Sequence, residues 1–392
     1  MKYLLSFVVS FLPTWLFFWQ NIRLFLRHRR WVICEEGSFG HQIALATAIC
    51  SKKGLNILYV KRNINRTNDT LFEFICSNAN VCTYNHLFLR NKRIRCSSAI
   101  LLKFFLNRCR VTVTNFYELC HVISAEMGYE GYATYDQNKN VRKHLNVGFL
   151  YSRDNQKIFI DSLNRWFDYK FKHEIDLLKN TVSSKFIYVV HRQKKDAVDY
   201  LDKIRNLDLS DILKRESCQI LSQFAVVHGG EASTQEFRFH PQTLASTLKI
   251  PVSVVDLFLF LKCSGYIGAQ SGPVWLVGQR EIPVLVLNAL PFFHGGFGEK
   301  HIVCYQKLVD DKGEKIDFQH VIASDLLITE YFDLVKGLSV HPMSETEVSE
   351  VVAEFSSLVC CGSLVKKQSF ESKGLNYAFD CPAAWASFIV NY

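Results

Sequence analysis

The stretch 252–288, with G-Y-I-G-A-Q-S-G-P at 265–273 in its centre, restricts the possible folds of this chain more than any other. It reads as a short apolar strand, a loop of small residues ending at Pro273, a helical segment and a second apolar strand. Gly268 and Gly272 permit backbone angles that other residues resist, and Pro273 suits the first position of a helix. This order predicts a βαβ unit of a parallel sheet, whose loop stands at a carboxyl strand end, where open α/β sheets bind ligands.

The small-residue loop of this stretch supports two interpretations. Free backbone amides at a helix start favour an anion such as a phosphate, and Ser271 can accept a hydrogen bond from one of them. A tight turn in an ordinary βαβ unit explains the same residues equally well. Both interpretations stay open on this stretch alone.

Two other apolar runs in the C-terminal half also end in polar or glycine-rich residues. The run 186–190 is followed by His191 and Arg192, and the run 224–227 is followed by H-G-G-E at 228–231. Arg192 carries a forked pair of donors that suits a diphosphate, although a basic surface run explains it too. Because the carboxyl ends of parallel strands meet at one edge of a sheet, we expect these loops to lie together.

The N-terminal half opens in the same way. An apolar run at 31–34 leads to a glycine-bearing loop that contains Glu36 and reaches His41, where a helical pattern begins. His41 at this helix start can be a catalytic base, a contact for phosphate or sugar, or a capping residue. Alternation of strands and helices continues along the chain and predicts an α/β fold with parallel sheets. We predict further strands at 55–60, 111–114 and 250–255, a helix opened by Asp256, and further helices at 71–77, 99–107, 116–127 and 343–355.

The first thirty residues form a segment of their own. Tyr3 to Trp19 carries no charge and is followed by a cluster of arginines from Arg23 to Arg30. We expect a signal-anchor or an interfacial helix, and the basic flank predicts that the domain behind it stays cytoplasmic. A cleaved signal peptide is disfavoured, because the basic charge follows the apolar run. A buried first helix stays possible, and Pro13 would kink a full span.

Composition narrows the class of protein. The chain has 392 residues, 48% of them hydrophobic and 21% charged, which predicts two or three globular domains. The net charge of +9 fits an anionic membrane surface, phosphorylated ligands or nucleic acid, but no nucleic-acid-binding signature occurs. The 13 cysteines are odd in number and scattered, which favours reduced thiols of a cytosolic domain.

The motifs from about 185 to 355 resemble those of a known family. They are V-V-H-G-G-E, D-L-F-L at 256–259, I-G-A-Q-S-G at 267–272, a strand ending in Asn288, and a late helix S-E-T-E-V-S-E-V-V-A-E-F. This series resembles a group of bacterial glycosyltransferases of the surface polysaccharide and lipopolysaccharide type. The resemblance implies the GT-B architecture: two Rossmann-like lobes with parallel sheets facing across a cleft.

The resemblance also implies roles for residues and segments. A nucleotide sugar is the substrate, with no cofactor and no obligatory metal. We expect a membrane-anchor or interfacial helix at 1–30, an acceptor-binding lobe at 31–180, a nucleotide-sugar-binding lobe at 181–345, and a C-terminal helix and tail at 346–392. The catalytic candidates are His41 and Glu36, and a loop with His294, Gly295 and Gly296 can close over the ligand. The donor-binding candidates are His191, Arg192, His228, Gly229, Gly230, Glu231, Gly268, Gln270, Ser271, Gly272 and Asn288.

Two functions follow from this pattern. The first is a glycosyltransferase that moves sugar from a nucleotide-sugar donor to a glycan or lipid-linked acceptor, at the cytoplasmic face of the inner or plasma membrane. The alternative is a membrane-associated, non-catalytic binding or scaffold protein on the same fold. Two departures from the family pattern favour the alternative: H-R-Q at 191–193 is a contracted H-x-R, and H-G-G-E at 228–231 replaces an R-x-G-D-like turn.

Overall fold

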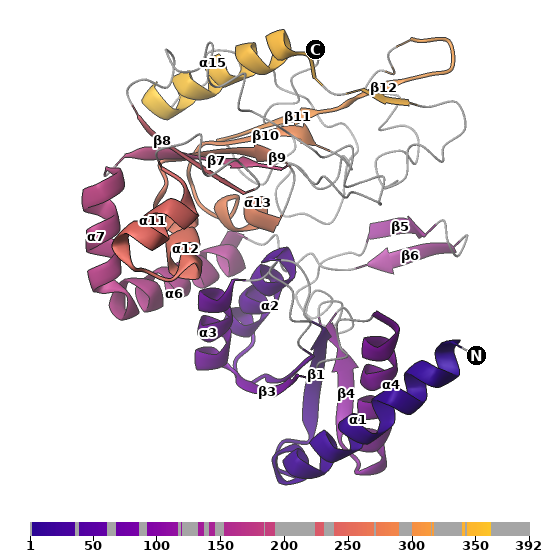
Figure 1. The fold of residues 1–392 in the computed structure, drawn as a ribbon. Helices are drawn as coiled ribbons and strands as arrows, with labels where there is room; N and C mark the ends of the chain where they lie inside the picture. The colour runs from indigo at the N-terminus through magenta and orange to yellow at the C-terminus, as the bar shows by residue number, and fades with distance from the viewer. Residues whose placement is uncertain are drawn as a thin grey trace. The chain divides into compact units, whose positions relative to one another are not determined.

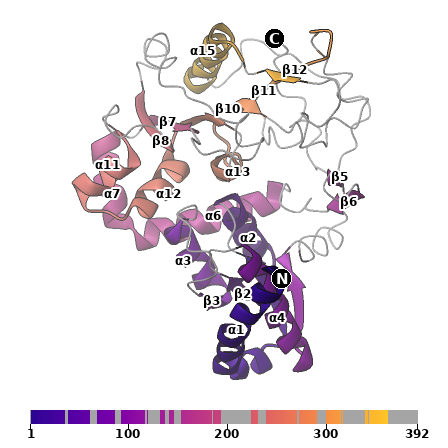
Figure 2. The ribbon, with the colours of Figure 1, turned by 45° about the vertical axis from the view of Figure 1, so that its right-hand side comes forward.

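The chain divides into two compact units, which we describe separately (Figures 1 and 2). Unit 1 comprises Met1–Glu130, Asn146–Leu150 and Asp154–Leu163, and unit 2 comprises the remaining residues. The division falls within helix α6 (Arg153–Lys170). The computed structural model describes residues 2–35, 39–60, 68–85, 92–116, 119, 132–136, 141–145, 153–183, 185–192, 224–230, 239–269, 272–289, 300–314, 316, 339–341 and 343–361.

Unit 1 is built on a four-stranded sheet in the order β3-β2-β1-β4, in which all neighbouring strands are parallel. Alternate residues of a strand point to opposite faces, so Leu58 joins a core with α1 and α4, while the ring of Tyr59 lies 4.7 Å from Phe72 of α3. The elements are α1 (Lys2–Arg27), β1 (Arg30–Glu35), α2 (Phe39–Ser51), β2 (Asn56–Val60), α3 (Asp69–Asn78), β3 (Asn80–Tyr84), α4 (Lys92–Arg108) and β4 (Thr112–Asn115).

Unit 2 is built on a five-stranded sheet in the order β11-β10-β9-β7-β8, again with every neighbouring pair parallel. Helix α15 covers one face of this sheet, and α12 and α13 lie on the other (Figure 1). The elements of the sheet are β7 (Phe186–His191), β8 (Ala225–Gly230), β9 (Gly265–Ala269), β10 (Val284–Ala289) and β11 (His301–Tyr305). The others are β5 (Tyr132–Asp136), β6 (Val141–Leu145), α7 (Lys172–Val182), α11 (Pro241–Leu248), α12 (Val252–Lys262), α13 (Gly272–Val277), β12 (Lys307–Val309), β13 (Ser339–His341) and α15 (Glu345–Cys361).

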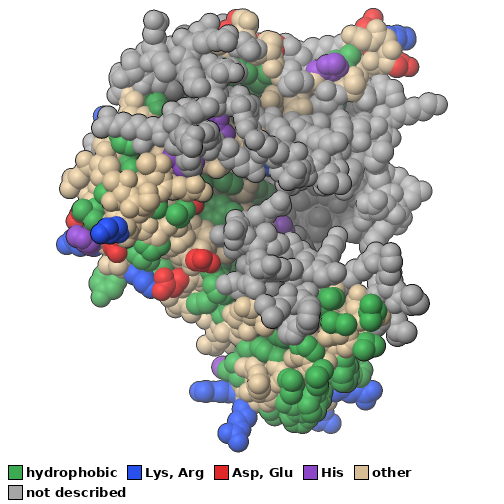
Figure 3. All heavy atoms as spheres, viewed as in Figure 1, with side chains coloured by type: hydrophobic (Ala, Val, Ile, Leu, Met, Phe, Trp, Pro, Cys, Tyr) green, Lys and Arg blue, Asp and Glu red, His purple; other side chains and the backbone are tan. Residues whose placement is uncertain are grey.

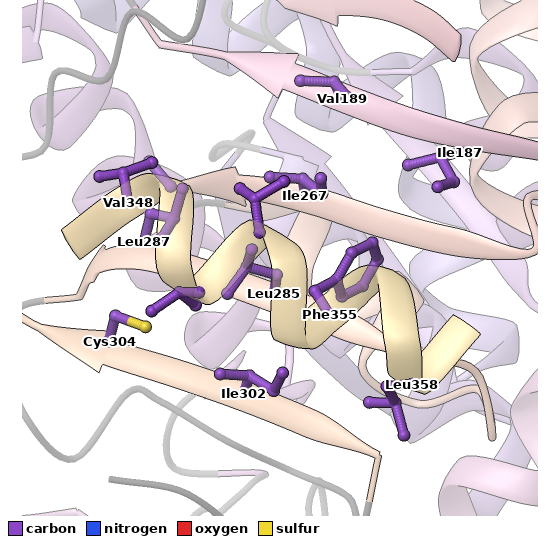
Figure 4. Close-up of a cluster of buried hydrophobic side chains, with 13 residues drawn as sticks. Ile187, Val189, Ile267, Leu285, Leu287, Ile302, Cys304, Val348, Phe355 and Leu358 are labelled. Atoms are coloured by element: carbon purple, nitrogen blue, oxygen red, sulfur yellow. The ribbon is translucent and has the colours of Figure 1, made fainter. Parts of the chain in front are cut away.

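The predicted α/β class with a parallel sheet in each half is therefore confirmed. The predicted late helix is also confirmed as α15, whose start carries the expected capping box. Ser344 N donates to Glu347 Oε2 at 2.7 Å, and Glu347 N donates to Ser344 Oγ at 3.4 Å. Val348 and Phe355 of this helix belong to one buried cluster with Leu285 and Leu287 of the sheet (Figure 4). The predicted domain limits stay predictions.

One predicted strand is wrong. The segment 250–255 does not form a strand, because α12 begins at Val252 after Pro251. Seven residues of α12 are buried, and the start of this helix carries three valines with a single polar residue between them, which imitates a buried strand. Asp256 consequently lies inside the helix and does not cap it.

Helix α1 runs unbroken from Lys2 to Arg27 through Pro13. Among the described residues it is the one helix whose length and composition suffice to cross a membrane, a property shared by buried core helices and signal sequences. Phe18 and Phe25 belong to the core of unit 1 together with Trp31 and Ile33. The first helix is thus an integral part of this unit.

Candidate functional site

The strand order of unit 2 defines where a ligand can bind. Counted along the chain, its strands lie in the order 2-1-3-4-5, so the connections leave β7 and β9 towards opposite sides. Ligands of such sheets bind in the crevice outside the carboxyl ends of these two strands. Val190 of β7 pairs with Gly268 of β9, which places Arg192 just beyond this point. Gly272 begins α13 after β9, so the structure brings Gly272 to the same edge as Arg192 and Gly268.

His191 and His228 form a buried pair at this edge. His191 Nε2 lies 2.9 Å from His228 Nδ1, and the two residues are 1% and 8% exposed. A hydrogen bond at this distance requires one ring nitrogen to donate and the other to accept. The pair therefore joins the ends of β7 and β8, and Arg192, which is only half-buried, is better placed to contact a ligand.

At two of the predicted donor-binding glycines, packing of the core explains why no side chain is present. A Cβ at Gly229 would collide with Tyr188 Oη and lie 2.7 Å from its Cε2, and a Cβ at Gly268 would lie 2.6 Å from Tyr266 Oη. Both tyrosines are fully buried. Gly230 differs, because its φ of +75° is a left-handed conformation that favours glycine. Glycine at 229 and 268 thus makes room for two tyrosines, a reason that the sequence did not reveal.

Asn288 holds the end of β10 in place. Its Oδ1 accepts a hydrogen bond from Met343 N at 3.2 Å, and its carbonyl oxygen accepts one from Gln306 Nε2 at 3.1 Å. Its φ of 49° is a left-handed conformation that asparagine tolerates better than most residues. These contacts tie the end of β10 to Gln306 and to Met343, which precedes α15. The predicted contact of Asn288 with the donor stays a prediction.

The carboxyl group of Asp256 interacts electrostatically with the buried Tyr188 of β7. Burial raises the pKa of Asp256 on α12 to about 7. Burial also raises the pKa of Tyr188, and the charges of Asp256 and Tyr266 add to the effect. Sequence reasoning treated Asp256 as a cap and missed its interaction with Tyr188, because that tyrosine comes from a strand distant in sequence.

In unit 1 the strand order 3-2-1-4 places the switch point between β1 and β4. The carboxyl end of β1 leads towards α2, where His41 is the third residue and its side chain is exposed. The next residue, Gln42, is buried and accepts a hydrogen bond from Asn68 N at 2.8 Å. This bond fixes the first turn of α2 against the start of α3, so His41 stands on a supported helix end.

The remaining predicted site residues lie outside the described residues. They are Glu36, Glu231, Gln270, Ser271, His294, Gly295 and Gly296, and their roles stay predictions. Within the part of the chain that the structure describes, no group of three or more His, Cys, Asp or Glu side chains could hold a metal ion. The predicted independence from metal is likewise untested.

Comparison with known proteins leaves the family of the chain open. No family model matches the sequence, and no curated protein matches it. Among solved structures the chain is similar to "The crystal structure of the glycosyl transferase family 9 from Veillonella parvula DSM 2008". The identity is 12% and the TM-score 0.38, over 86% of this chain and 98% of that chain. At this TM-score the similarity carries no argument about function.

Proposed function

We propose that the chain is a metal-independent glycosyltransferase of the GT-B type, which transfers a sugar from a nucleotide-sugar donor to a glycan or lipid-linked acceptor. The sequence motifs from 185 to 355 support the proposal, together with a parallel sheet in each unit. The observation that carries it is the position of Arg192, directly after β7 at the switch point of the unit 2 sheet.

In the proposed reaction Arg192 binds the diphosphate of the donor. The bond between the anomeric carbon and the phosphate oxygen breaks, and its electrons leave with the nucleoside diphosphate. The guanidinium stabilises this growing negative charge. Helix α13, which begins at Gly272, has only six residues, so its macrodipole is small. Arg192 therefore supplies most of the stabilisation of the diphosphate charge.

The acceptor is proposed to bind unit 1. Its hydroxyl oxygen forms the new bond to the anomeric carbon, and its proton passes to a base at the carboxyl end of β1. His41 and Glu36 are the candidates for this base. The exposed side chain of His41, on the first turn of a helix fixed by Gln42, supports the assignment.

We further propose that the enzyme acts at the cytoplasmic face of the inner or plasma membrane, in the synthesis of cell-surface polysaccharide. The support is the apolar helix α1 and the arginines that follow its hydrophobic part. The alternative, a non-catalytic binding or scaffold protein, is favoured by one observation. His191 and His228 are buried and bonded to each other instead of standing open to a ligand.

Calorimetric titration of the full-length protein with UDP- and GDP-sugars, which carry the diphosphate that the reaction requires, tests the proposal. The full chain is needed because Phe18 and Phe25 of α1 lie in the core of unit 1. We expect one donor class to bind, and Arg192→Ala to weaken that binding by roughly tenfold to a hundredfold, the usual range for a charged hydrogen-bonding group. The control Arg165→Ala removes an exposed arginine of α6 and should leave the affinity unchanged.

Three outcomes of these titrations are decisive. Binding that is equally strong in the Arg192→Ala and Arg165→Ala variants contradicts the donor site. Absence of binding to every nucleotide sugar contradicts the whole proposal. Donor binding without release of the nucleoside diphosphate, in the presence of membrane extracts that contain acceptors, favours the scaffold alternative.

A further inference from the structure

Helix α1 has two faces of different character, and one of them is packed against its own unit. Ser6, Ser10, Thr14 and Phe18 follow one another at every fourth residue, and all are buried. This spacing places them on one side of the helix. Helix α4 lies along this side, which is therefore a packing face and not a face for lipid.

Specific bonds hold the packed face in place. Ser10 Oγ donates to the carbonyl oxygen of Ile94 on α4 at 3.1 Å, and Thr14 Oγ1 lies 3.1 Å from the hydroxyl of Tyr84 on β3. Further along, the ring of Phe18 lies 5.4 Å from that of Phe105. A helix that crossed a bilayer alone would have to give up all these contacts. The contacts therefore hold α1 alongside α4.

The opposite face of α1 is apolar and exposed. Its large hydrophobic side chains are between 40% and 66% exposed, and many recur at intervals of three or four residues. The apolar surface continues onto α4 through Ile100 and Phe104, which are 64% and 51% exposed. Figure 3 shows hydrophobic side chains gathered over these two helices. The members on α1 are Leu5, Phe7, Val8, Phe11, Leu12, Trp15, Leu16, Trp19 and Leu26.

The charge around this surface has one sign. Neither α1 nor α4 contains an aspartate or a glutamate. Exposed Arg23 and Arg27 lie at the end of α1, and on α4 the guanidinium of Arg108 stands over the ring of Phe104 at 5.3 Å. An apolar face with tryptophans, on two helices whose charged residues are all basic, is complementary to the interface of an anionic bilayer.

We propose that α1 and α4 together form a two-helix surface that docks onto one leaflet of an anionic bilayer, with α1 lying along the membrane instead of crossing it. The inference rests on the membrane location proposed above and does not depend on glycosyl transfer. It adds α4 to the contact and decides between an interfacial and a spanning helix.

Flotation of the full-length protein with vesicles tests the proposal. We expect binding to phosphatidylcholine vesicles that contain about 30% phosphatidylglycerol, and much weaker binding to phosphatidylcholine alone. Ile100→Glu should weaken binding by at least about tenfold, because it places a charge where the isoleucine side chain would be buried in the bilayer. Arg23→Gln and Arg27→Gln should each weaken binding to anionic vesicles by about fivefold.

The control is Ile158→Glu, which changes an isoleucine on α6 that is 47% exposed and lies outside the two-helix surface. It should bind like the unaltered protein, and the circular dichroism of all variants should agree. Binding that resists alkaline carbonate and is unchanged in Ile100→Glu indicates a spanning helix and overturns the proposal. Equally contrary would be a solution dimer that Ile100→Glu dissociates, with no vesicle binding by the unaltered protein.

Discussion

Substitution of Gly229 by alanine separates a core role of this glycine from a ligand role. The new Cβ would lie 2.7 Å from Cε2 and 2.9 Å from Cζ of Tyr188, besides colliding with its hydroxyl. Tyr188 has little freedom to move, because its ring lies 5.0 Å from that of Phe260 and 6.3 Å from that of Tyr266. Overpacking of this kind costs about 1–3 kcal/mol. For a unit of this size that lowers the melting temperature by roughly 2–12 °C.

A double-mutant cycle with Tyr188→Phe checks the cause. Removing the hydroxyl relieves the worst collision but leaves both carbon contacts, so the Gly229→Ala/Tyr188→Phe protein should recover only part of the lost stability. Gly313→Ala is the control, since Gly313 has a φ of +83° with nothing near its Cβ position and should show no coupling to Tyr188. Thermal unfolding and donor titration are measured on each variant. Unchanged stability with lost donor binding in Gly229→Ala would refute the core explanation.

Two further predictions concern pH and differ in sign. Burial raises the pKa of Asp256 from 3.8 to about 7. The contribution of this carboxyl group to the free energy of unfolding is therefore complete below pH 3.8 and is lost as the pH rises through 7. Asp256→Asn should therefore raise the free energy of unfolding by up to about 4 kcal/mol near pH 8, and change it little below pH 3.8. Equal urea midpoints for the variant and the unaltered protein near pH 8 would contradict this. Burial lowers the pKa of His301 from 6.5 to about 4, so its contribution is present above pH 6.5 and is lost as the pH falls through 4. In urea titrations, His301→Gln should remove up to about 3 kcal/mol of the fall in the unfolding free energy of unit 2 between pH 6.5 and pH 4. The same fall in the variant as in the unaltered protein would refute the assignment.

The local order of strands and helices was predictable because it follows from apolar runs and their terminators. The runs at 186–190 and 284–287 are short, wholly apolar and bounded by polar residues or proline, and both are strands of the parallel sheet. The same rule failed at 250–255. There the segment contains a single polar residue, Ser253, so no polar spacing distinguishes the helix from a strand.

The side-chain partners at the site were not predictable, because they join strands through the tertiary fold. Glycine at 229 and 268 fits both a ligand and a neighbouring tyrosine, and only the packing of Tyr188 and Tyr266 shows which contact exists. The bond between His191 and His228 spans 37 positions. The two faces of α1 were hidden for a similar reason, since the partner of Ser10 lies 84 positions away on α4.

The position of a bound nucleotide decides whether Arg192 holds the donor. A crystal structure of the full-length protein with the nucleoside diphosphate of its tightest-binding donor would show this position. We predict that the diphosphate oxygens lie within hydrogen-bonding distance of the Arg192 guanidinium, outside the carboxyl ends of β7 and β9. A nucleotide bound at the opposite edge of the sheet, or with its diphosphate held without Arg192, would contradict it.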